Sequence, residues 1–261
     1  MADRAAQSNM IARVPAPAAI DDAALALLRR RESERCVVFA RWDALQPEED
    51  AYDEEAFEAL RLALMRVTSL GTEPVLCLYR GEDPAWFAAR GGWQKEDNLR
   101  CYLRYVGRVV RTVGHLCAGY ITFCEPNALV WEGEVHASLS RALTALSHMA
   151  CTHVRAVRLV RDTRAQRGFD DTSVGIVMRM RPASELRLAF LRGRQTAGAA
   201  LYERLPLLAM VRGEFHLPLR NTLRVQPGIW ADFVGVTGTR SEQCAARAKT
   251  LTGAAVWIME G

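Results

Sequence analysis

Several short apolar segments of this 261-residue chain are followed by polar or acidic residues. Glu125 comes just after the apolar run 117–123, and Glu260 directly follows the run 255–259. Carboxyl groups donate and accept protons, so two of them at one edge of a fold could carry out acid–base chemistry. In a parallel barrel the chemistry sits at the carboxyl ends of the strands. We therefore expect the functional residues at the ends of these apolar runs.

The elements that must hold these carboxylates alternate between strands and helices. Short apolar or β-branched runs predict strands at 36–40, 74–79, 117–123, 174–178, 231–236 and 255–259. Helical spacing predicts helices at 23–31, 54–68, 97–113 and 137–160. This alternation is typical of βα units around a parallel sheet, and both an open doubly wound sheet and a closed barrel fit it. The usual nucleotide-binding signatures, GxGxxG and GxxxxGKS/T, are missing.

The composition argues against several classes of protein. The formal net charge is only +4, and the basic residues, arginines except for Lys95 and Lys249, are spread along the chain. Because a nucleic-acid footprint would form a clustered basic stripe, we expect no nucleic-acid partner. No apolar run approaches the roughly 20 residues that span a membrane, so we expect no membrane partner. The N-terminus lacks the apolar stretch of a signal peptide.

The cysteines indicate a reducing environment. There are seven of them, an odd number, with no CxxC pair, and several lie inside apolar runs. This pattern favours reduced core thiols in a cytoplasmic protein over a disulfide framework or a zinc site. We expect no metal and no cofactor.

Several collinear segments resemble those of a known family. Residues 121–127 read Ile-Thr-Phe-Cys-Glu-Pro-Asn and resemble ITFNEPN, that family's most specific signature. Residues 72–87 are similar to EPVVTLYHWDLPQWL, 91–93 to GGW and 232–236 to DFIGIN. On these motifs the chain resembles family 1 glycoside hydrolases of the β-glucosidase type. The resemblance implies a TIM-type (β/α)8 barrel domain over residues 21–261, and the Ala/Pro-rich residues 1–20 are predicted to be a flexible arm.

The match is shorter than the family's barrel at both ends. The family's first strand has no clear equivalent, and the sequence stops before the eighth. Open strand edges invite pairing, and a barrel needs all its strands to close. We therefore expect an incomplete barrel, or one closed by the N-terminal arm near residues 9–14, or one completed by a second copy in a homo-oligomer.

The resemblance also implies a catalytic pair. Retaining β-glycosidases use two carboxylates about 5 Å apart, one as acid/base and one as nucleophile. Glu125 matches the family's acid/base, and Glu260 matches its nucleophile, because residues 254–261 resemble LPIYITENG. Asn127, which ends the ITFNEPN-like signature, is a candidate substrate-binding residue.

The residues around this pair depart from the family's pattern. The sugar-contacting His and Trp fall on Arg80 and Gly81, and the Tyr that contacts the nucleophile falls on Gly238. The Asn that holds the sugar 2-hydroxyl falls on Cys124, a substrate-binding candidate with only a weak S–H donor. Bonds to the 2-hydroxyl strengthen in the transition state. Because these sugar contacts are lost, we expect the rate of glucoside hydrolysis to be lower by on the order of 10³-fold.

Arg80 has three interpretations. Its guanidinium could pair with Glu125 and favour the charged carboxylate, which is the opposite of what a general acid needs near neutrality. It could instead bind the phosphate or carboxylate of an anionic sugar and so take part in substrate binding. Alternatively, it is a surface arginine bonded to Glu82 or Asp83.

Three functions from different classes remain open. The first is a retaining β-glycosidase that uses Glu125 and Glu260 and acts on an anionic or small aryl glycoside. The second is a pseudoenzyme that binds a carbohydrate or phosphorylated sugar without cleaving it. The third is a structural or interaction scaffold built on the barrel. A fold alone does not choose among them, because function belongs to the site.

Overall fold

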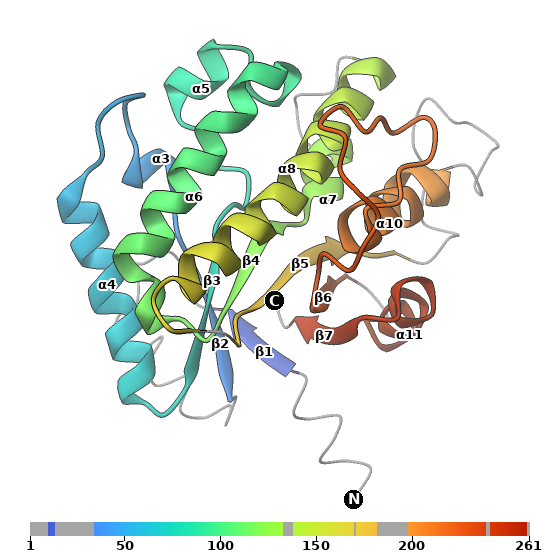
Figure 1. Ribbon diagram of the computed structural model, residues 1–261. Helices are drawn as coiled ribbons and strands as arrows, with labels where there is room; N and C mark the ends of the chain where they lie inside the picture. The colour runs from blue at the N-terminus through green and yellow to red at the C-terminus, as the bar shows by residue number, and fades with distance from the viewer. Residues whose placement is uncertain are drawn as a thin grey trace, which may run out of the picture.

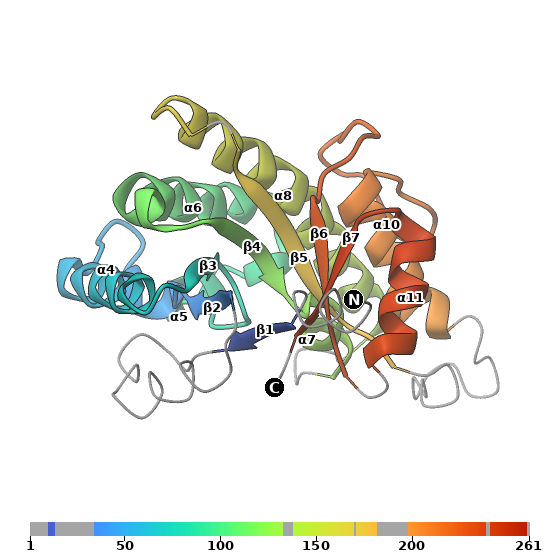
Figure 2. The same ribbon diagram turned by 90° about the horizontal axis from the view of Figure 1, so that it is seen from below.

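The barrel is the framework of the fold. The computed structural model describes residues 10–13, 34–132, 138–169, 171–181, 198–238 and 241–259. Within them, seven parallel strands form a closed barrel in which sequence neighbours pair (Figures 1 and 2). They are β1 (Met10–Arg13), β2 (Arg35–Phe39), β3 (Glu73–Cys77), β4 (Gly119–Cys124), β5 (Ser173–Arg179), β6 (Phe233–Thr237) and β7 (Ala255–Met259). Strands β2 to β7 confirm the six predicted strands. The barrel is closed but has seven described strands where a TIM-type (β/α)8 barrel has eight, and in that sense it is incomplete.

Strand β1 closes the barrel. It pairs in parallel with β2, where Ala12 lies opposite Cys36, and with β7, where Met10 lies opposite Ile258. Of the three predicted outcomes, the structure thus shows closure by a segment near residues 9–14, and this closure does not require a strand from a second copy. Met10–Arg13 is thus a strand inside the segment predicted to be a flexible arm. The rest of that arm, 1–9 and 14–20, lies outside the described residues, as does the predicted helix 23–31.

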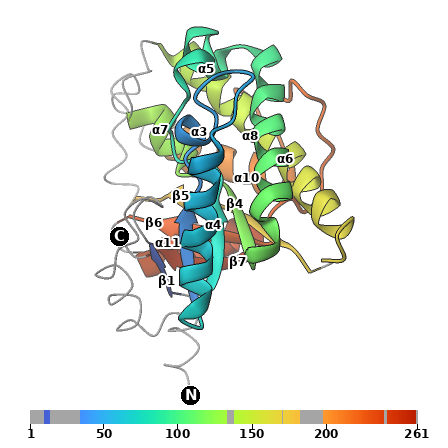
Figure 3. The ribbon, with the colours of Figure 1, turned by 90° about the vertical axis from the view of Figure 1, so that its left-hand side faces the viewer.

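Helices cover the outside of the barrel. Two of them, α4 (Glu54–Ser69) and α6 (Leu99–Val113), run along one flank (Figures 1 and 3). The Asp53 side chain caps α4 by accepting from the Ala56 N–H, as expected of a residue before a helix. The longest described helix, α8 (Leu139–Ala165), confirms the prediction for 137–160. The helices that sequence periodicity missed are α3 (Trp42–Leu45), α5 (Ala85–Ala89), α7 (Pro126–Glu132), α10 (Leu205–Arg212) and α11 (Ser241–Thr252).

Short single-turn helices connect the longer elements. The 3-10 turns are η2 (Gly92–Gln94), η3 (Glu96–Asn98) and η4 (Gly114–Leu116), and η7 (Ala200–Arg204) is a π-helix that runs into α10. The turn η2 joins α5 to the start of the α6 region, and it carries Trp93 into the core. These connections shape the carboxyl-terminal side of the barrel.

Two separate cores hold the molecule together. The barrel interior is filled by apolar side chains, at alternate positions except where β4 shifts register between Ile121 and Cys124: Val37, Phe39, Val75, Cys77, Ile121, Cys124, Val177, Phe233, Trp257 and Met259. This two-residue period is the one that a strand requires to place side chains on one face. The other core lies between the sheet and its helices, around an aromatic cluster in which Trp42 stacks on Tyr105 with 5.3 Å between ring centroids.

All seven cysteines are buried and free. Their position confirms the prediction of core thiols. Among the described helices, none has the length and apolar character to cross a membrane.

Candidate active site at the carboxyl end of β4

Glu125 lies at the carboxyl end of β4, where the sequence places it, in an unusual backbone conformation. Its φ is 57°, in the left-handed region that side chains rarely adopt. Its N–H donates to the Val177 carbonyl at 2.7 Å, and its own carbonyl accepts from Leu129 in α7 at 3.0 Å. The pairing of β4 with β5 shifts register between Ile121 and Cys124. Such strand-end irregularities re-aim side chains next to active sites, and Glu125 remains 8% exposed.

The carboxylate of Glu125 is paired with an arginine from the next strand. Arg179, the last residue of β5, donates from Nη2 to Oε2 of Glu125 at 2.5 Å. The same guanidinium donates from Nη1 to Glu132 at 2.9 Å, and Arg181 donates to the same oxygen of Glu132 at 2.9 Å. The hydroxyl of Tyr202 also donates to Glu132. Two carboxylates and two guanidinium groups thus form one nearly neutral network.

The pKa values of two members of this network, Arg179 and Tyr202, are raised by their surroundings. Burial lowers the pKa of Arg179, but Glu125 and Glu132 together outweigh burial and raise it. Burial and the neighbouring Glu132 raise the pKa of Tyr202, which therefore stays protonated. A guanidinium that donates to a carboxylate stabilises the ionised form of that carboxylate. Glu125 therefore has surroundings suited to a base, whereas a general acid needs surroundings that favour its protonated form.

Of the three interpretations of Arg80, the structure supports neither the pair with Glu125 nor the pairs with Glu82 and Asp83; Glu125 is paired with Arg179 instead. Arg80 is exposed at the end of β3, and its guanidinium lies 4.9 Å from the ring centroid of Phe39. Among the described residues, Arg80 forms no ion pair with Glu125, Glu82 or Asp83. Arg179, at the end of β5, supplies the guanidinium that contacts Glu125.

Cys124 and Asn127 already have protein contacts. Cys124 is 2% exposed and belongs to the barrel interior, where its thiol lies beside that of Cys77. The amide of Asn127 donates to the carbonyls of Arg179 at 2.7 Å and Tyr202 at 3.1 Å, and its oxygen accepts from the Arg179 N–H. Asn127 therefore ties the start of α7 to the end of β5 and to η7. Substrate binding by either residue stays a prediction, and for Asn127 it would require these bonds to break.

Two of the departures from the family's pattern are built into the backbone. Gly238 has a φ of 115°, and a Cβ there would lie 2.2 Å from the carbonyl oxygen of Met180. Gly81 also has a φ of 115°, and a Cβ there would lie 2.6 Å from the side chain of Leu129. A side chain such as the family's Tyr therefore does not fit at 238, and one at 81 would require Leu129 to move and a strained backbone.

The sequence missed the partners of Glu125, and Glu260 lies outside the described residues. Arg179 and Arg181 flank Met180 at the end of the predicted strand 174–178, so an alternating pair of arginines was the available signal. Glu132 ends α7, a helix that the sequence did not predict. The last described residue before Glu260 is Met259, in the barrel interior.

The comparisons with known proteins agree with the geometry. Residues 61–223 match the model of glycosyl hydrolase family 1. The fold is similar to a β-glucosidase from Exiguobacterium marinum (TM-score 0.67, 20% identity, 82% of this chain and 52% of that chain). It is also similar to the AHE enzyme from Alicyclobacillus herbarius (TM-score 0.73, 17% identity, 90% of this chain and 64% of that chain).

Two curated plant proteins are similar over a shorter stretch. The "Beta-glucosidase-like SFR2, chloroplastic" of Oryza sativa subsp. japonica is 30% identical over 95 residues, 34% of this chain and 15% of that protein. The "Galactolipid galactosyltransferase SFR2, chloroplastic" of Arabidopsis thaliana is 29% identical over 92 residues, 33% of this chain and 15% of that protein. The chain thus aligns with 15% of the length of these curated relatives and about half of the Exiguobacterium marinum enzyme.

Proposed function

Because the chain belongs to glycosyl hydrolase family 1, we propose that it hydrolyses β-glycosides by the retaining route, slowly and only when the leaving group is good. Glu125 would be the acid/base and Glu260 the nucleophile. The observation that carries this proposal is the 2.5 Å contact between Arg179 and Glu125 at the end of β4. This contact favours the ionised form of Glu125, so the carboxylate can accept a proton but is a poor proton donor.

The retaining route divides the work of Glu125 into two steps. In the first, the carboxylate of Glu260 would attack the anomeric carbon, the bond to the aglycone oxygen would break, and that oxygen would take a proton from Glu125. In the second, Glu125 would remove a proton from water as the water displaces Glu260. An arginine beside Glu125 opposes the first role and is compatible with the second.

Substrates that leave as stable anions would avoid the weak step. A dinitrophenolate needs no proton to depart, whereas an alkoxide does. Cys124 and Gly238 stand where the family has groups that contact the sugar and the nucleophile, so ground-state binding and 2-hydroxyl stabilisation would also be poor. We therefore expect measurable turnover of activated aryl glycosides and almost none of alkyl glycosides.

The test is a series of aryl β-glucosides of decreasing leaving-group acidity, with Glu125→Gln, Glu260→Gln and azide. Wild-type rates should fall steeply along the series, and Glu260→Gln should abolish release. Glu125→Gln should lose about 10²-fold on the dinitrophenyl glucoside because deglycosylation lacks its base. Azide needs no base, so it should restore release and yield a β-glucosyl azide.

The matched control is Glu73→Gln, an exposed carboxylate at the opposite, amino end of β3 that pairs with Arg35. It should leave every rate unchanged. No release from any glucoside, or release that is indifferent to both Glu125 and Glu260, would remove the hydrolase proposal.

A second candidate function is the binding of an anionic sugar without cleavage. It is favoured by Arg80, which stands at the end of β3 beside Phe39 and forms no ion pair within the part of the chain that is described. A guanidinium binds phosphate in a bidentate manner. Glucose 6-phosphate, but not glucose, should then raise the melting temperature, and Arg80→Gln should abolish that shift.

We also infer that the protein works in a reducing compartment such as the cytoplasm. The support is the set of seven buried free thiols, which would be at risk of mispairing during folding in an oxidising compartment. The two plant relatives carry chloroplastic in their names. Fractionation of the native host would distinguish these locations.

A further inference from the structure

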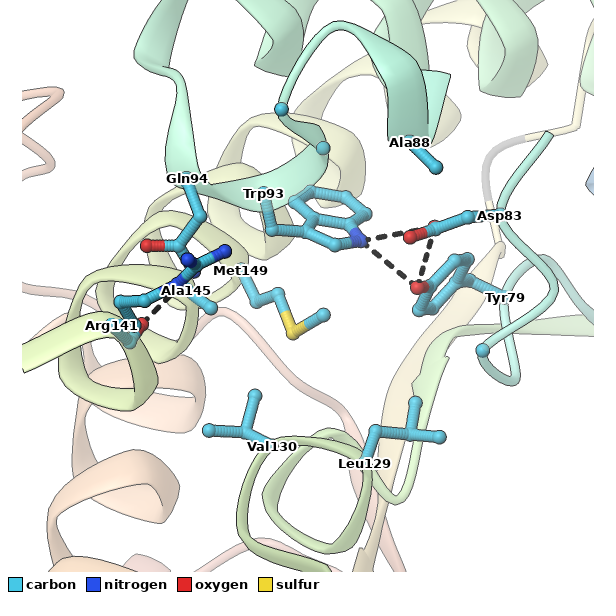
Figure 4. Close-up of a pocket in the computed structure, with 13 residues that line it drawn as sticks. Tyr79, Asp83, Ala88, Trp93, Gln94, Leu129, Val130, Arg141, Ala145 and Met149 are labelled. Carbon is cyan, nitrogen blue, oxygen red and sulfur yellow. Dashed lines mark hydrogen bonds between the residues drawn. The ribbon is translucent and has the colours of Figure 1, made fainter. Parts of the chain in front are cut away.

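A cavity separate from the Glu125 site opens between the loop after β3 and the helices on its outer side. Its volume is about 350 Å³, and its walls come from the β3 loop, α5 and η2, α7 and α8 (Figure 4). The apolar wall is formed by Leu129 and Val130 of α7 and by Ala145 and Met149 of α8. Small residues, Gly91 and Gly92 among them, also line the cavity and leave space in it. A concave apolar site with a few convergent polar groups is the usual form of a small-molecule site.

On one side of the cavity lies the carboxyl group of Asp83, of which one oxygen accepts hydrogen bonds from neighbouring side chains. Oδ1 of Asp83 accepts from the Tyr79 hydroxyl at 2.8 Å and from Trp93 Nε1 at 3.3 Å. The Tyr79 hydroxyl in turn accepts from Trp93 Nε1 at 2.9 Å, so the three groups hold one another in place. Within the described residues, Oδ2 of Asp83 has no hydrogen-bond donor. Asp83 therefore offers a fixed acceptor to a ligand.

The other side of the cavity carries a cation. Arg141, near the start of α8, lies across the cavity from Asp83 with Met149 between them (Figure 4). Its backbone carbonyl accepts from Gln94 at 3.0 Å, which fixes this end of α8 against η2. Its guanidinium is exposed and forms no ion pair with any residue that the structure describes. A cation at the rim is thus available to an anionic group.

The cavity and the Glu125 site do not share side chains. Glu125 is paired with Arg179 at the end of β5, and neither residue, nor Glu132 or Tyr202 of the same network, lines the cavity. The two sites adjoin through α7, which begins beside Glu125 and presents Leu129 and Val130 to the cavity, and through the loop after β3, where Gly81 lines the cavity.

We infer that this cavity binds a small apolar carboxylic acid that carries a hydroxyl at its far end. The hydroxyl donates to Oδ2 of Asp83, the apolar body packs against Met149, Val130 and Leu129, and the carboxylate pairs with Arg141. Each polar end of such a ligand meets a group of complementary character, and its middle meets only carbon and sulfur. The inference goes beyond the proposed hydrolysis and does not depend on it.

Calorimetry with 3-(4-hydroxyphenyl)propionate as the probe tests this assignment. We expect one molecule to bind at pH 7.5 with a Kd in the millimolar range or tighter. 3-Phenylpropionate, which lacks the hydroxyl, and 4-ethylphenol, which lacks the carboxylate, should each bind about tenfold more weakly, since each lacks one hydrogen bond to a charged group. Failure of the probe to bind, or equal binding of all three compounds, overturns the inference.

Three variants locate the probe. Asp83→Asn retains an oxygen that accepts from Tyr79 and Trp93, so it should fold and lose about tenfold in affinity for the probe but not for 3-phenylpropionate. Arg141→Gln should lose about tenfold for the probe but not for 4-ethylphenol. Glu125→Gln should bind the probe as the wild type does. Binding that is unaffected by Asp83→Asn and Arg141→Gln overturns the inference, whatever the outcome of the glycoside assays.

Discussion

Glu125 and Asp83 are carboxyl groups at the same end of the barrel with opposite surroundings. A guanidinium donates to Glu125 at 2.5 Å, whereas the donors to Asp83 within the described part of the chain are the neutral groups of Tyr79 and Trp93. Burial raises the pKa of Asp83 to about 6. An ion-paired carboxylate stays charged, and a buried one without a cation takes up a proton near neutrality. The family's acid/base position thus holds the carboxylate less suited to donate a proton, because surroundings and not motif position set the protonation state.

Next to Arg179, the partner of Glu125, the backbone of Gly238 packs closely against Met180. The variant Gly238→Ala would disrupt this packing. The added Cβ would lie 2.2 Å from the Met180 carbonyl oxygen, and φ there is 115°. Both the collision and the strained backbone destabilise the folded state, so we expect the free energy of unfolding to fall by about 3 kcal/mol or more. Urea titration followed by circular dichroism measures it.

Gly253→Ala is the matched control for the backbone strain alone. Gly253 has a φ of 72° with nothing within 4 Å of the position of a Cβ. Its loss should be about 1 kcal/mol, the cost of a left-handed alanine. Equal losses in the two variants would mean that the strand end can move to accept a side chain at 238, and that the family's tyrosine could be restored.

The Asp83 side of the comparison predicts a pH-dependent gain in stability. The pKa is raised from 3.8 to about 6, chiefly by burial and further by the charge of Glu82, so the folded state favours the protonated carboxyl. The contribution of Asp83 is then fully favourable below pH 3.8 and is lost as the pH rises through 6. About two pKa units correspond to about 3 kcal/mol. Asp83→Asn, which cannot ionise, should therefore stabilise the protein by about that amount at pH 8 and by almost nothing at pH 3.5.

Denaturant titrations at the two pH values check this prediction. Asp97→Asn, at an exposed carboxyl of η3, is the control and should change stability by less than about 0.5 kcal/mol at either pH. If Asp83→Asn gave the same change at pH 3.5 and pH 8, the carboxyl would not titrate between them and the contrast with Glu125 would disappear.

The sequence predicts the elements of this fold better than the partners of its site. Strands such as β5 and helices such as α8 follow from local apolar spacing, which the chain displays over five to twenty residues. The motif around Glu125 likewise indicates where that carboxylate lies. Arg179, however, is 54 residues further along the chain and reaches Glu125 through the register of β5 beside β4, with its irregularity. The spacing of apolar residues within one segment does not determine the register between two strands.

The protonation of Asp83 was beyond sequence reasoning for a related reason. It depends on Tyr79 and Trp93 enclosing one carboxyl oxygen, and the turn η2 that carries Trp93 has no periodic signal. The closing strand β1 is a contrasting case. The missing edge of the barrel left three predicted outcomes, and the structure shows one of them, in which a segment near 9–14 fills that edge.

Removing the guanidinium of Arg179 should make Glu125 more like Asp83 in how readily its carboxyl group holds a proton. Arg179→Gln keeps a donor but loses the charge, so Glu125 would hold a proton more readily and serve better as the acid. We expect turnover of aryl glucosides with poor leaving groups to rise about tenfold, or about 1.4 kcal/mol of transition-state stabilisation, while the dinitrophenyl glucoside is unchanged. Arg181→Gln, which loses a contact to Glu132 and none to Glu125, is the matched control and should leave the ratio of the two rates as it is. If Arg179→Gln slowed both substrates equally, the arginine would act by holding Glu125 in position, and its charge would not be what limits the first step.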